Sequence, residues 1–128
     1  MYLLDSDFLI NFLKGKEKEV KFIHKATSAN LSTSIICIGE VLEGLYATNN
    51  EDKTAQFEQL ITKFKSFEIN REVINEFALL RANLRTQGKL IDNLDLLIAA
   101  TCMAYNLTLV TSNISHFKRI PKLKIYRE

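Results

Sequence analysis

Short apolar segments alternate with longer segments of mixed polarity along this chain. The short segments, such as "YLL" and "LTLV", are apolar without clean alternation, as in strands buried on both faces of a parallel sheet. They predict strands at residues 2–4, 31–34, 66–69, 107–111 and 123–126. The longer segments predict helices at residues 7–14, 17–28, 35–47, 53–64, 71–86 and 93–105. The alternation favours an α/β fold in which helices cover both faces of a parallel sheet.

The composition is that of an ordinary soluble globular protein. The chain has 128 residues, 47% hydrophobic and 25% charged, which suits one compact domain over residues 1–128. No apolar run approaches the roughly 20 residues of a membrane helix, and the N-terminus does not resemble a signal peptide. Cys37 and Cys102 both fall in apolar helical segments. Buried free thiols suit a reducing compartment, so we expect a cytoplasmic protein.

Two acids, Asp5 and Asp7, separate the first predicted strand from the helix that follows it. Thr111 and Asn113 stand at the end of another predicted strand. Ligands bind beyond the carboxyl ends of strands in open parallel sheets, so we expect these residues at one sheet edge. Asp5 also has a simpler interpretation, because Asp is a good helix N-cap and acids suit a helix N-terminus. Asn113 could equally cap the turn after its strand.

Glu40 lies well inside a predicted helix, in "SIICIGEVLEGLY", where capping cannot explain it. Its helical neighbours include Ile36 and Cys37, so much of the surrounding surface is apolar. A carboxylate on such a face must be paired, protonated or bound to a cation. A structural ion pair with a lysine is the alternative interpretation. Gly39 and Gly44 reduce helix propensity, which suggests that another backbone approaches this helix closely.

Asp92 and Asp95 open the helix predicted at residues 93–105. Asp92 is placed to act as the N-cap, and Asp95 stands at the third helical position, as in an acidic capping box. The rest of this helix is apolar almost all round, which predicts a buried central helix. Asp95 is therefore expected at the N-terminal mouth of a buried helix, near the edge of the sheet.

Asp5, Glu40 and Asp95 come from three separate segments that could converge at this edge. Clustered carboxylates raise one another's pKa, so a fold that keeps them needs a compensating charge. A hard divalent cation such as Mg²⁺ supplies it, because it prefers oxygen ligands. The two histidines, His24 and His116, are isolated and give no spacing typical of zinc sites.

The chain resembles the PIN-domain family, specifically the small VapC-type toxin ribonucleases of bacterial toxin–antitoxin pairs. The matching segments are "LLDSDFLINFLKG", "SIICIGEVLEGLY", "LIDNLDLLIAATCMAYNLTLVTSN" and "HFKRIPKLKI". They occur in the family's order from the first predicted strand to the last. The most specific part is an acid followed by "LLIAA", then "LVT", then "N", then "HF".

This resemblance implies a three-layer α/β/α PIN-like fold around a central parallel sheet of four to five short strands. It also implies an acidic site for Mg²⁺ or Mn²⁺, in which Asp5, Glu40 and Asp95 are the catalytic and metal-binding residues. The expected supporting residues are Ser6, Asp7, Asp92, Thr111 and Asn113. Asn113 occupies a position that is often acidic in the family, so here it is expected to orient a water or an ion.

The resemblance further implies a divalent-metal-dependent endoribonuclease, with RNA and often tRNA as the substrate. It implies a homodimer, for which Ile10, Phe12 and Tyr46 could supply an apolar interface. It also implies a VapB-like antitoxin whose C-terminal segment blocks the site. The candidates for phosphate contacts are Arg85, Lys89, Lys118 and Arg119, for which ordinary solvated surface is the alternative.

Other functions fit the sequence less well. The "DSD" segment after the first strand is also found in phosphatases with an aspartyl nucleophile. Those enzymes need a lysine at a late strand end, which "LTLVTSN" lacks. A PIN-like scaffold that binds RNA or protein without cutting it, or a general RNA-processing nuclease without an antitoxin, is the remaining alternative. The uncharged Asn113 favours the scaffold, whereas the presence of all three acids disfavours it.

Overall fold

The computed structural model describes residues 1–128, and its centre is one parallel sheet of four short strands in the order β3-β2-β1-β4. The strands are β1 (Tyr2–Leu4), β2 (Leu31–Ser34), β3 (Lys65–Phe67) and β4 (Thr108–Val110). Leu3 pairs with Ser32 on one side and with Leu109 on the other. Because every pairing is parallel, all four strands end at the same edge of the sheet.

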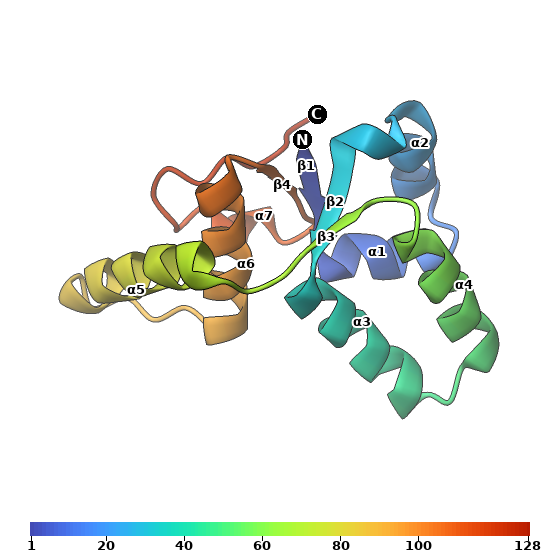
Figure 1. Cartoon of the computed structure of the whole chain (residues 1–128), viewed down its shortest axis with the longest axis horizontal. Coiled ribbons are helices and arrows are strands. Elements are labelled where there is room, and N and C mark those ends of the chain that lie inside the picture. Colours follow the sequence, from blue (N-terminus) through green and yellow to red (C-terminus); the bar gives the residue numbers. More distant parts are fainter.

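Helices cover both faces of this sheet. They are α1 (Ser6–Leu13), α2 (Glu17–Lys25), α3 (Ile35–Ala47), α4 (Glu51–Ile61), α5 (Arg71–Thr86), α6 (Asn93–Tyr105) and α7 (Ile114–Phe117). Helices α5 and α6 pack together on one side, and α1, α2 and α4 lie on the other (Figure 1). Helix α3 extends beyond the carboxyl ends of the strands and contacts α1, α4 and α6. The expected three-layer α/β/α fold is confirmed.

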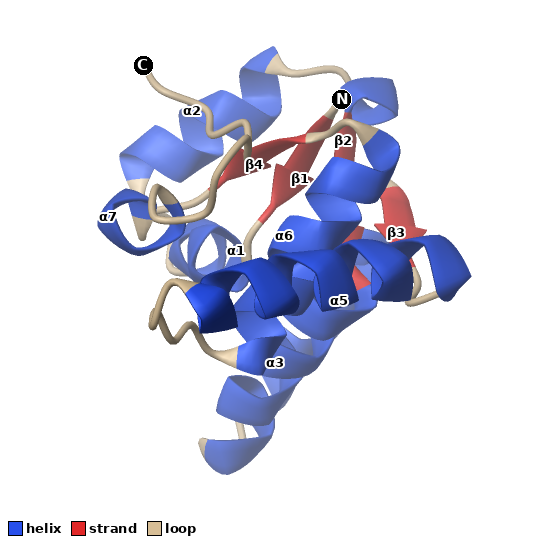
Figure 2. Ribbon diagram, turned by 90° about the vertical axis from the view of Figure 1, so that its left-hand side faces the viewer, coloured by secondary structure: helices blue, strands red, loops and turns tan.

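The core lies on both sides of β1. Leu3, Leu4 and Leu109 have no solvent exposure, and Ile98 of α6 is equally buried. The Thr33 hydroxyl, also fully buried, donates a hydrogen bond of 2.9 Å to the Leu4 carbonyl oxygen. Polar residues can occupy the centre of the sheet because the backbone satisfies them. Figure 2 shows β1 and β4 behind α6, with α5 as the outermost element on that side.

Three helices begin at the carboxyl edge of the sheet, and each begins at a side-chain cap. Asp5 caps α1, and the Ser34 hydroxyl caps α3 by accepting from the Cys37 amide at 3.1 Å. The Asp92 carboxylate caps α6 by accepting from the Leu94 amide at 3.1 Å. Both acids that have a capping interpretation therefore do cap helices, and this fixes their backbone positions at the edge.

The structure differs from the expected elements in four main places, one of which is helix α4, which ends at Ile61 and not at residue 64. Residues 123–126 do not form a full strand, and only Ile125 bridges to Leu109. The helix expected to reach residue 28 ends at Lys25, because residues 28–30 turn into a short 3₁₀ helix before β2. Helix α7 is too short to give a clear periodic signal, and the sequence did not predict it.

The interpretation of the glycines in α3 was wrong. A Cβ atom added at Gly39 or at Gly44 would meet no atom within 4 Å. Neither glycine therefore permits a close backbone approach. The two cysteines, in contrast, are buried and unpaired as expected. None of the helices is both long and apolar enough to span a membrane.

Candidate active site

Asp5 is the best-fixed side chain at the carboxyl edge. It is only 4% exposed, and its Oδ1 accepts from the Ser6 amide at 2.8 Å. Its Oδ2 accepts from the Thr111 hydroxyl at 2.7 Å. The Asp5 amide itself donates to the Val110 carbonyl at 3.0 Å, which ties the end of β1 to the end of β4. The carboxylate is thus held by backbone and hydroxyl groups from two adjacent strand ends.

Thr111 organises the second acid of this segment. Its hydroxyl lies 3.4 and 3.5 Å from the two oxygens of Asp7, while the Ser112 amide donates to Asp7 at 3.3 Å. The Asn113 amide donates to the Thr111 oxygen at 3.0 Å. Thr111, the residue directly after β4, therefore joins both acids to the turn that precedes α7.

Glu40 reaches the same edge from α3. Ligand atoms of Asp5, Cys37 and Glu40 all lie within 4.8 Å of one another. The Cys37 Sγ is 3.8 Å from the Asp5 Oδ1. The convergence predicted for Asp5 and Glu40 is therefore present, whereas Asp95 lies outside this tight group.

The electrostatics of this cluster are those of uncompensated negative charge. Burial, with the Asp7 carboxylate next in importance, raises the pKa of Asp5 to about 7. Burial also raises the pKa of Glu40, with smaller contributions from Asp95 and Asp92. None of the ion pairs in the structure involves Asp5, Asp7 or Glu40. The alternative in which Glu40 forms a structural ion pair with a lysine is therefore excluded.

Asp95 has a different environment, on the first turn of α6. Its Oδ2 lies 2.8 Å from the His116 Nε2 of α7, and both side chains are about one-quarter exposed. Asp95 and Asp92 are close enough to Glu40 to raise its pKa. Asp95 therefore lies at the border of the Asp5–Glu40 cluster, and its carboxylate also contacts His116.

Sequence reasoning missed two members of this neighbourhood. His116 was treated as an isolated histidine, although it contacts Asp95 across 21 residues of sequence. Cys37 was assigned only to the core, although its thiol borders the acidic group. The "HF" in the family resemblance was the one signal that pointed to His116. For Cys37 the signal was its position three residues before Glu40 on the same helical face.

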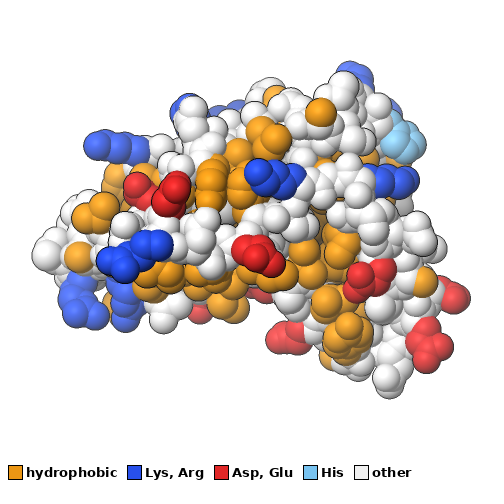
Figure 3. Space-filling view, viewed as in Figure 1, with side chains coloured by type: hydrophobic (Ala, Val, Ile, Leu, Met, Phe, Trp, Pro, Cys, Tyr) orange, Lys and Arg blue, Asp and Glu red, His pale blue; other side chains and the backbone are white.

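The predicted phosphate contacts fall into two kinds. Arg119 donates to the Leu90 carbonyl at 2.8 Å, so it supports the loop that leads into α6. Arg85 and Lys89 are exposed near that loop and make no ion pair, and Lys118 is exposed after α7. In the space-filling view, basic side chains gather over the outer end of α5, with hydrophobic side chains beside them (Figure 3).

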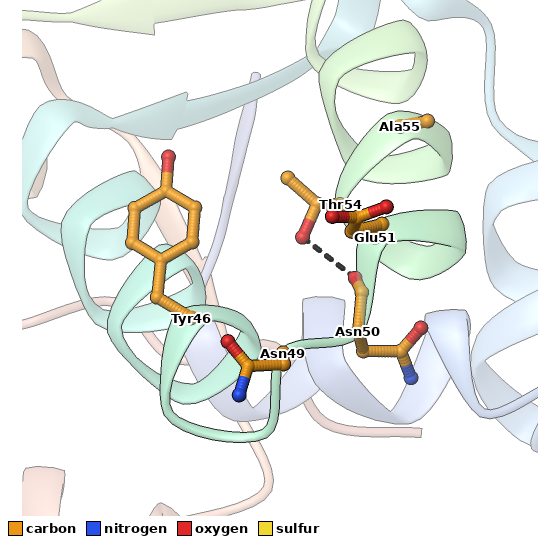
Figure 4. Close-up of a pocket in the computed structure, with 6 residues that line it drawn as sticks. All are labelled: Tyr46, Asn49, Asn50, Glu51, Thr54 and Ala55. Carbon is orange, nitrogen blue, oxygen red and sulfur yellow. Dashed lines mark hydrogen bonds between the residues drawn. The ribbon is translucent and has the colours of Figure 1, made fainter.

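A separate hollow of about 580 Å³ lies at the turn from α3 to α4. Figure 4 shows Tyr46 on one wall and Thr54 on the other, with the Thr54 hydroxyl donating to the Asn50 carbonyl at 2.8 Å. Glu51 is the only acid among its lining residues. The hollow therefore lacks the cluster of acids that distinguishes the sheet edge.

Comparison with known proteins agrees with this geometry. Residues 2–123 match the family model described as the PIN domain. Ribonuclease VapC1 of Methanocaldococcus jannaschii is 32% identical over 126 residues, which cover 97% of this chain and 85% of the relative. Ribonuclease VapC1 of Haemophilus influenzae strain R2866 is 25% identical over 127 residues, covering 97% and 95%.

A solved structure shows the same fold. The crystal structure of VapBC2 from Rickettsia felis bound to a promoter DNA fragment contains a chain that superposes with a TM-score of 0.89 at 26% identity. The superposition covers 98% of this chain and 96% of the other. The chain therefore belongs to the PIN-domain family and, within it, to the VapC-type ribonucleases.

Proposed function

We propose that this chain is a divalent-metal-dependent endoribonuclease and the toxin of a VapBC-type toxin–antitoxin pair. The observation that carries the proposal is the group of buried or half-buried carboxylates of Asp5, Asp7 and Glu40 at the sheet edge, none of which forms an ion pair with a cationic side chain. The relatives named ribonuclease VapC1 support the assignment of RNA as the substrate.

The donor atoms at this edge fit a hard divalent cation. Asp5 and Glu40 offer carboxylate oxygens, which Mg²⁺ and Mn²⁺ prefer. Burial raises the pKa of Cys37 well above its ordinary value, so the neighbouring thiol stays protonated and is a poor ligand. A bound cation would acidify a coordinated water and stabilise charge on the scissile phosphate.

The side chains divide into ligands and supports. Asp5, Glu40 and Asp95 are the proposed ligands. Thr111 keeps Asp5 in a single orientation through its 2.7 Å hydrogen bond, and His116 does the same for Asp95 at 2.8 Å. Such outer contacts orient ligands, and the hydrogen bond from Thr111 also lowers the pKa of Asp5 against the raising effect of burial, and so favours its ionised form. Asp7 adds negative charge, and burial raises its pKa as well.

The remaining supporting residues act mainly through the backbone. Ser6 donates its amide to Asp5, and Asp92 fixes the start of α6. Asn113 holds Thr111 through its own amide, and its side chain is exposed. We therefore propose that Asn113 positions Thr111, and that its amide side chain is free to contact a water or the RNA.

We propose a VapB-like antitoxin and a second copy of the chain as protein partners. The structural neighbours include VapBC complexes from Rickettsia felis and from nontypeable Haemophilus influenzae, which supports the first. Exposed apolar side chains support a protein interface, since Tyr46 is 60%, Leu79 67% and Leu90 83% exposed. Ile10 and Phe12, which we expected at an interface, are half-buried in the monomer.

The test is cleavage of total RNA and of a tRNA pool by purified protein freed of antitoxin, with Mg²⁺, Mn²⁺ or EDTA. Discrete fragments that require the cation are expected from the wild type, and none from Asp95→Asn or Glu40→Gln. Glu43→Gln is the matched control, because Glu43 is exposed one helical turn after Glu40. Cleavage that survives in EDTA or in Glu40→Gln would contradict the assignment. Absence of cleavage by the folded wild type would favour a binding scaffold.

A further inference from the structure

A second cavity adjoins the acidic edge on the side of α2. It has a volume of about 340 Å³ and is lined on one side by Thr111 and Ser112, the residues that hold Asp7. Its other walls include Phe22 of α2 and Tyr126 near the C-terminus. Small-ligand sites start at about this size, roughly 300 Å³. A group bound here would therefore lie beside the acidic site.

A buried acid, Glu19 of α2, faces this cavity. The residue is only 6% exposed. Its Oε2 accepts from the Asn11 side-chain amide at 3.3 Å, and Asn11 also contacts the Ser112 hydroxyl at 3.5 Å. No protein group contacts the other carboxylate oxygen. Because every fully buried side-chain oxygen in the structure has a partner, that second oxygen is not fully buried, and Glu19 is among the residues that line the cavity.

The cavity also has a basic rim. Lys18 and Arg127 line it, and Lys18 lies 3.7 Å from Glu128 in an exposed pair. A shallow extension of the same hollow continues over Lys21 and Lys25 of α2, where Lys21 pairs with Glu17 at 2.6 Å. Cations therefore outnumber acids at the mouth of the cavity, where Glu128 also lies, whereas its interior presents a carboxylate and aromatic rings. This combination disfavours a cationic ligand and favours a neutral hydrogen-bond donor attached to an anion.

We propose that this cavity is a nucleobase subsite that selects guanine next to the scissile phosphate, with Glu19 as the specificity-determining residue. Proteins commonly recognise unstacked RNA bases with aromatic side chains and with hydrogen bonds to the Watson–Crick edge. Guanine alone presents two adjacent donors there, N1–H and N2–H₂, which a carboxylate can accept together. Lys18 and the lysines that follow it on α2 contact the backbone phosphates. This inference rests on the proposed ribonuclease function.

The first test is nucleotide binding without metal, which does not depend on cleavage. The full-length, antitoxin-free protein in EDTA is titrated by calorimetry with the 5′-monophosphates of guanosine, adenosine, cytidine and uridine. Guanosine monophosphate is expected to bind about tenfold more tightly than the others, since only guanine can donate two adjacent hydrogen bonds to Glu19. Glu19→Gln should abolish this preference. Glu17→Gln should retain it, because Glu17 is exposed on the same helix.

The second test is the sequence around the cut in an RNA pool. The wild type should favour guanine at one fixed position beside the cleaved bond, and Glu19→Gln should cleave with that preference lost. Equal binding of the four nucleotides, or an undiminished guanine preference in Glu19→Gln, would overturn the proposal. Glu19-dependent binding of arginine amide in place of guanosine monophosphate would also overturn it, by assigning the cavity to a cationic protein partner. Guanine-selective binding without any cleavage would refute the ribonuclease function alone.

Discussion

Asp5 and Asp95 begin as similar residues and end in different environments. Each stands at the N-terminus of a helix that starts at the carboxyl edge of the sheet. Asp5 is buried among neutral donors and other acids, whereas Asp95 is partly exposed and paired with His116. The comparison shows that helix position alone does not set the chemistry of an acid. The charge of the neighbours decides whether a carboxylate is stable by itself or needs a cation.

The largest expected difference follows from Asp5→Asn. Asparagine keeps an oxygen for the Ser6 amide, so the cap is preserved, but the charge is lost. We expect cleavage to fall by at least about 100-fold. In EDTA at pH 8, the melting temperature should rise, because the substitution removes a buried charge that destabilises the folded protein. The rise should be about 3–5 °C for each kcal/mol gained in the free energy of unfolding.

Asp95→Asn sharpens the comparison. It should also abolish cleavage, but the melting temperature in EDTA should stay level or fall, because the change removes the partner of His116. A fall in melting temperature for Asp5→Asn would show that the Asp5 charge is already compensated in the metal-free protein.

The second prediction concerns the pH dependence of stability without metal. The pKa of Asp5 is about 7 in the folded chain and near 3.8 when unfolded. The folded protein therefore binds the extra proton between these values, so this residue lowers the free energy of unfolding as pH rises from about 4 to 7. Chemical denaturation in EDTA across this range measures the slope. Asp5→Asn should lack this contribution, and an equal slope in both proteins would contradict the assignment.

The third prediction concerns His116. Replacing it with Gln removes the imidazole that orients Asp95, so Mn²⁺ affinity should fall about 10–100-fold. His24→Gln is the control, because His24 is exposed on α2. Calorimetric titration with Mn²⁺ measures the effect. Unchanged affinity in His116→Gln would mean that the histidine pair is only structural.

The smallest expected effects concern Arg85 and Lys89. Changing either residue to Gln should weaken RNA binding by a catalytically inactive variant a few-fold. The slope of the logarithm of the binding constant against the logarithm of salt concentration should fall in magnitude by about one, because one phosphate contact is lost. Arg71→Gln is the control, since Arg71 lies at the other end of α5 and donates to Asn75 at 3.0 Å. Equal salt slopes in all variants would place the RNA path elsewhere, for example along α2.

Much of the sheet edge could be predicted because it depends on local order in the chain. A buried strand followed by Asp5, and an apolar helix that begins with Asp95, fix both acids at the edge of any parallel α/β fold. Glu40 was conspicuous because no local role explained an acid at that position. The resemblance to a known family then assigned these residues to one site.

The remaining features depend on contacts between distant segments. The Asp95–His116 pair exists only because α7 folds back beside α6. The strand expected at residues 123–126 is reduced to one bridge at Ile125, because only the backbone groups of Lys124 and Tyr126 hydrogen-bond to β4, both at Leu109. Glu19 had a weak signal: it precedes Phe22 and Ile23 by three and four residues, and so shares their packed face. Its acceptor Asn11 and the cavity beyond could not be inferred from that spacing.

The most direct test of the account is calorimetric titration of Mn²⁺ into the metal-free wild type and into Asp5→Asn at pH 8, where Asp5 is largely ionised. The account predicts saturable binding by the wild type and affinity at least about tenfold weaker for the folded variant. Equal affinity in the two proteins, or no binding to the wild type, would contradict the claim that the acidic edge is a metal site.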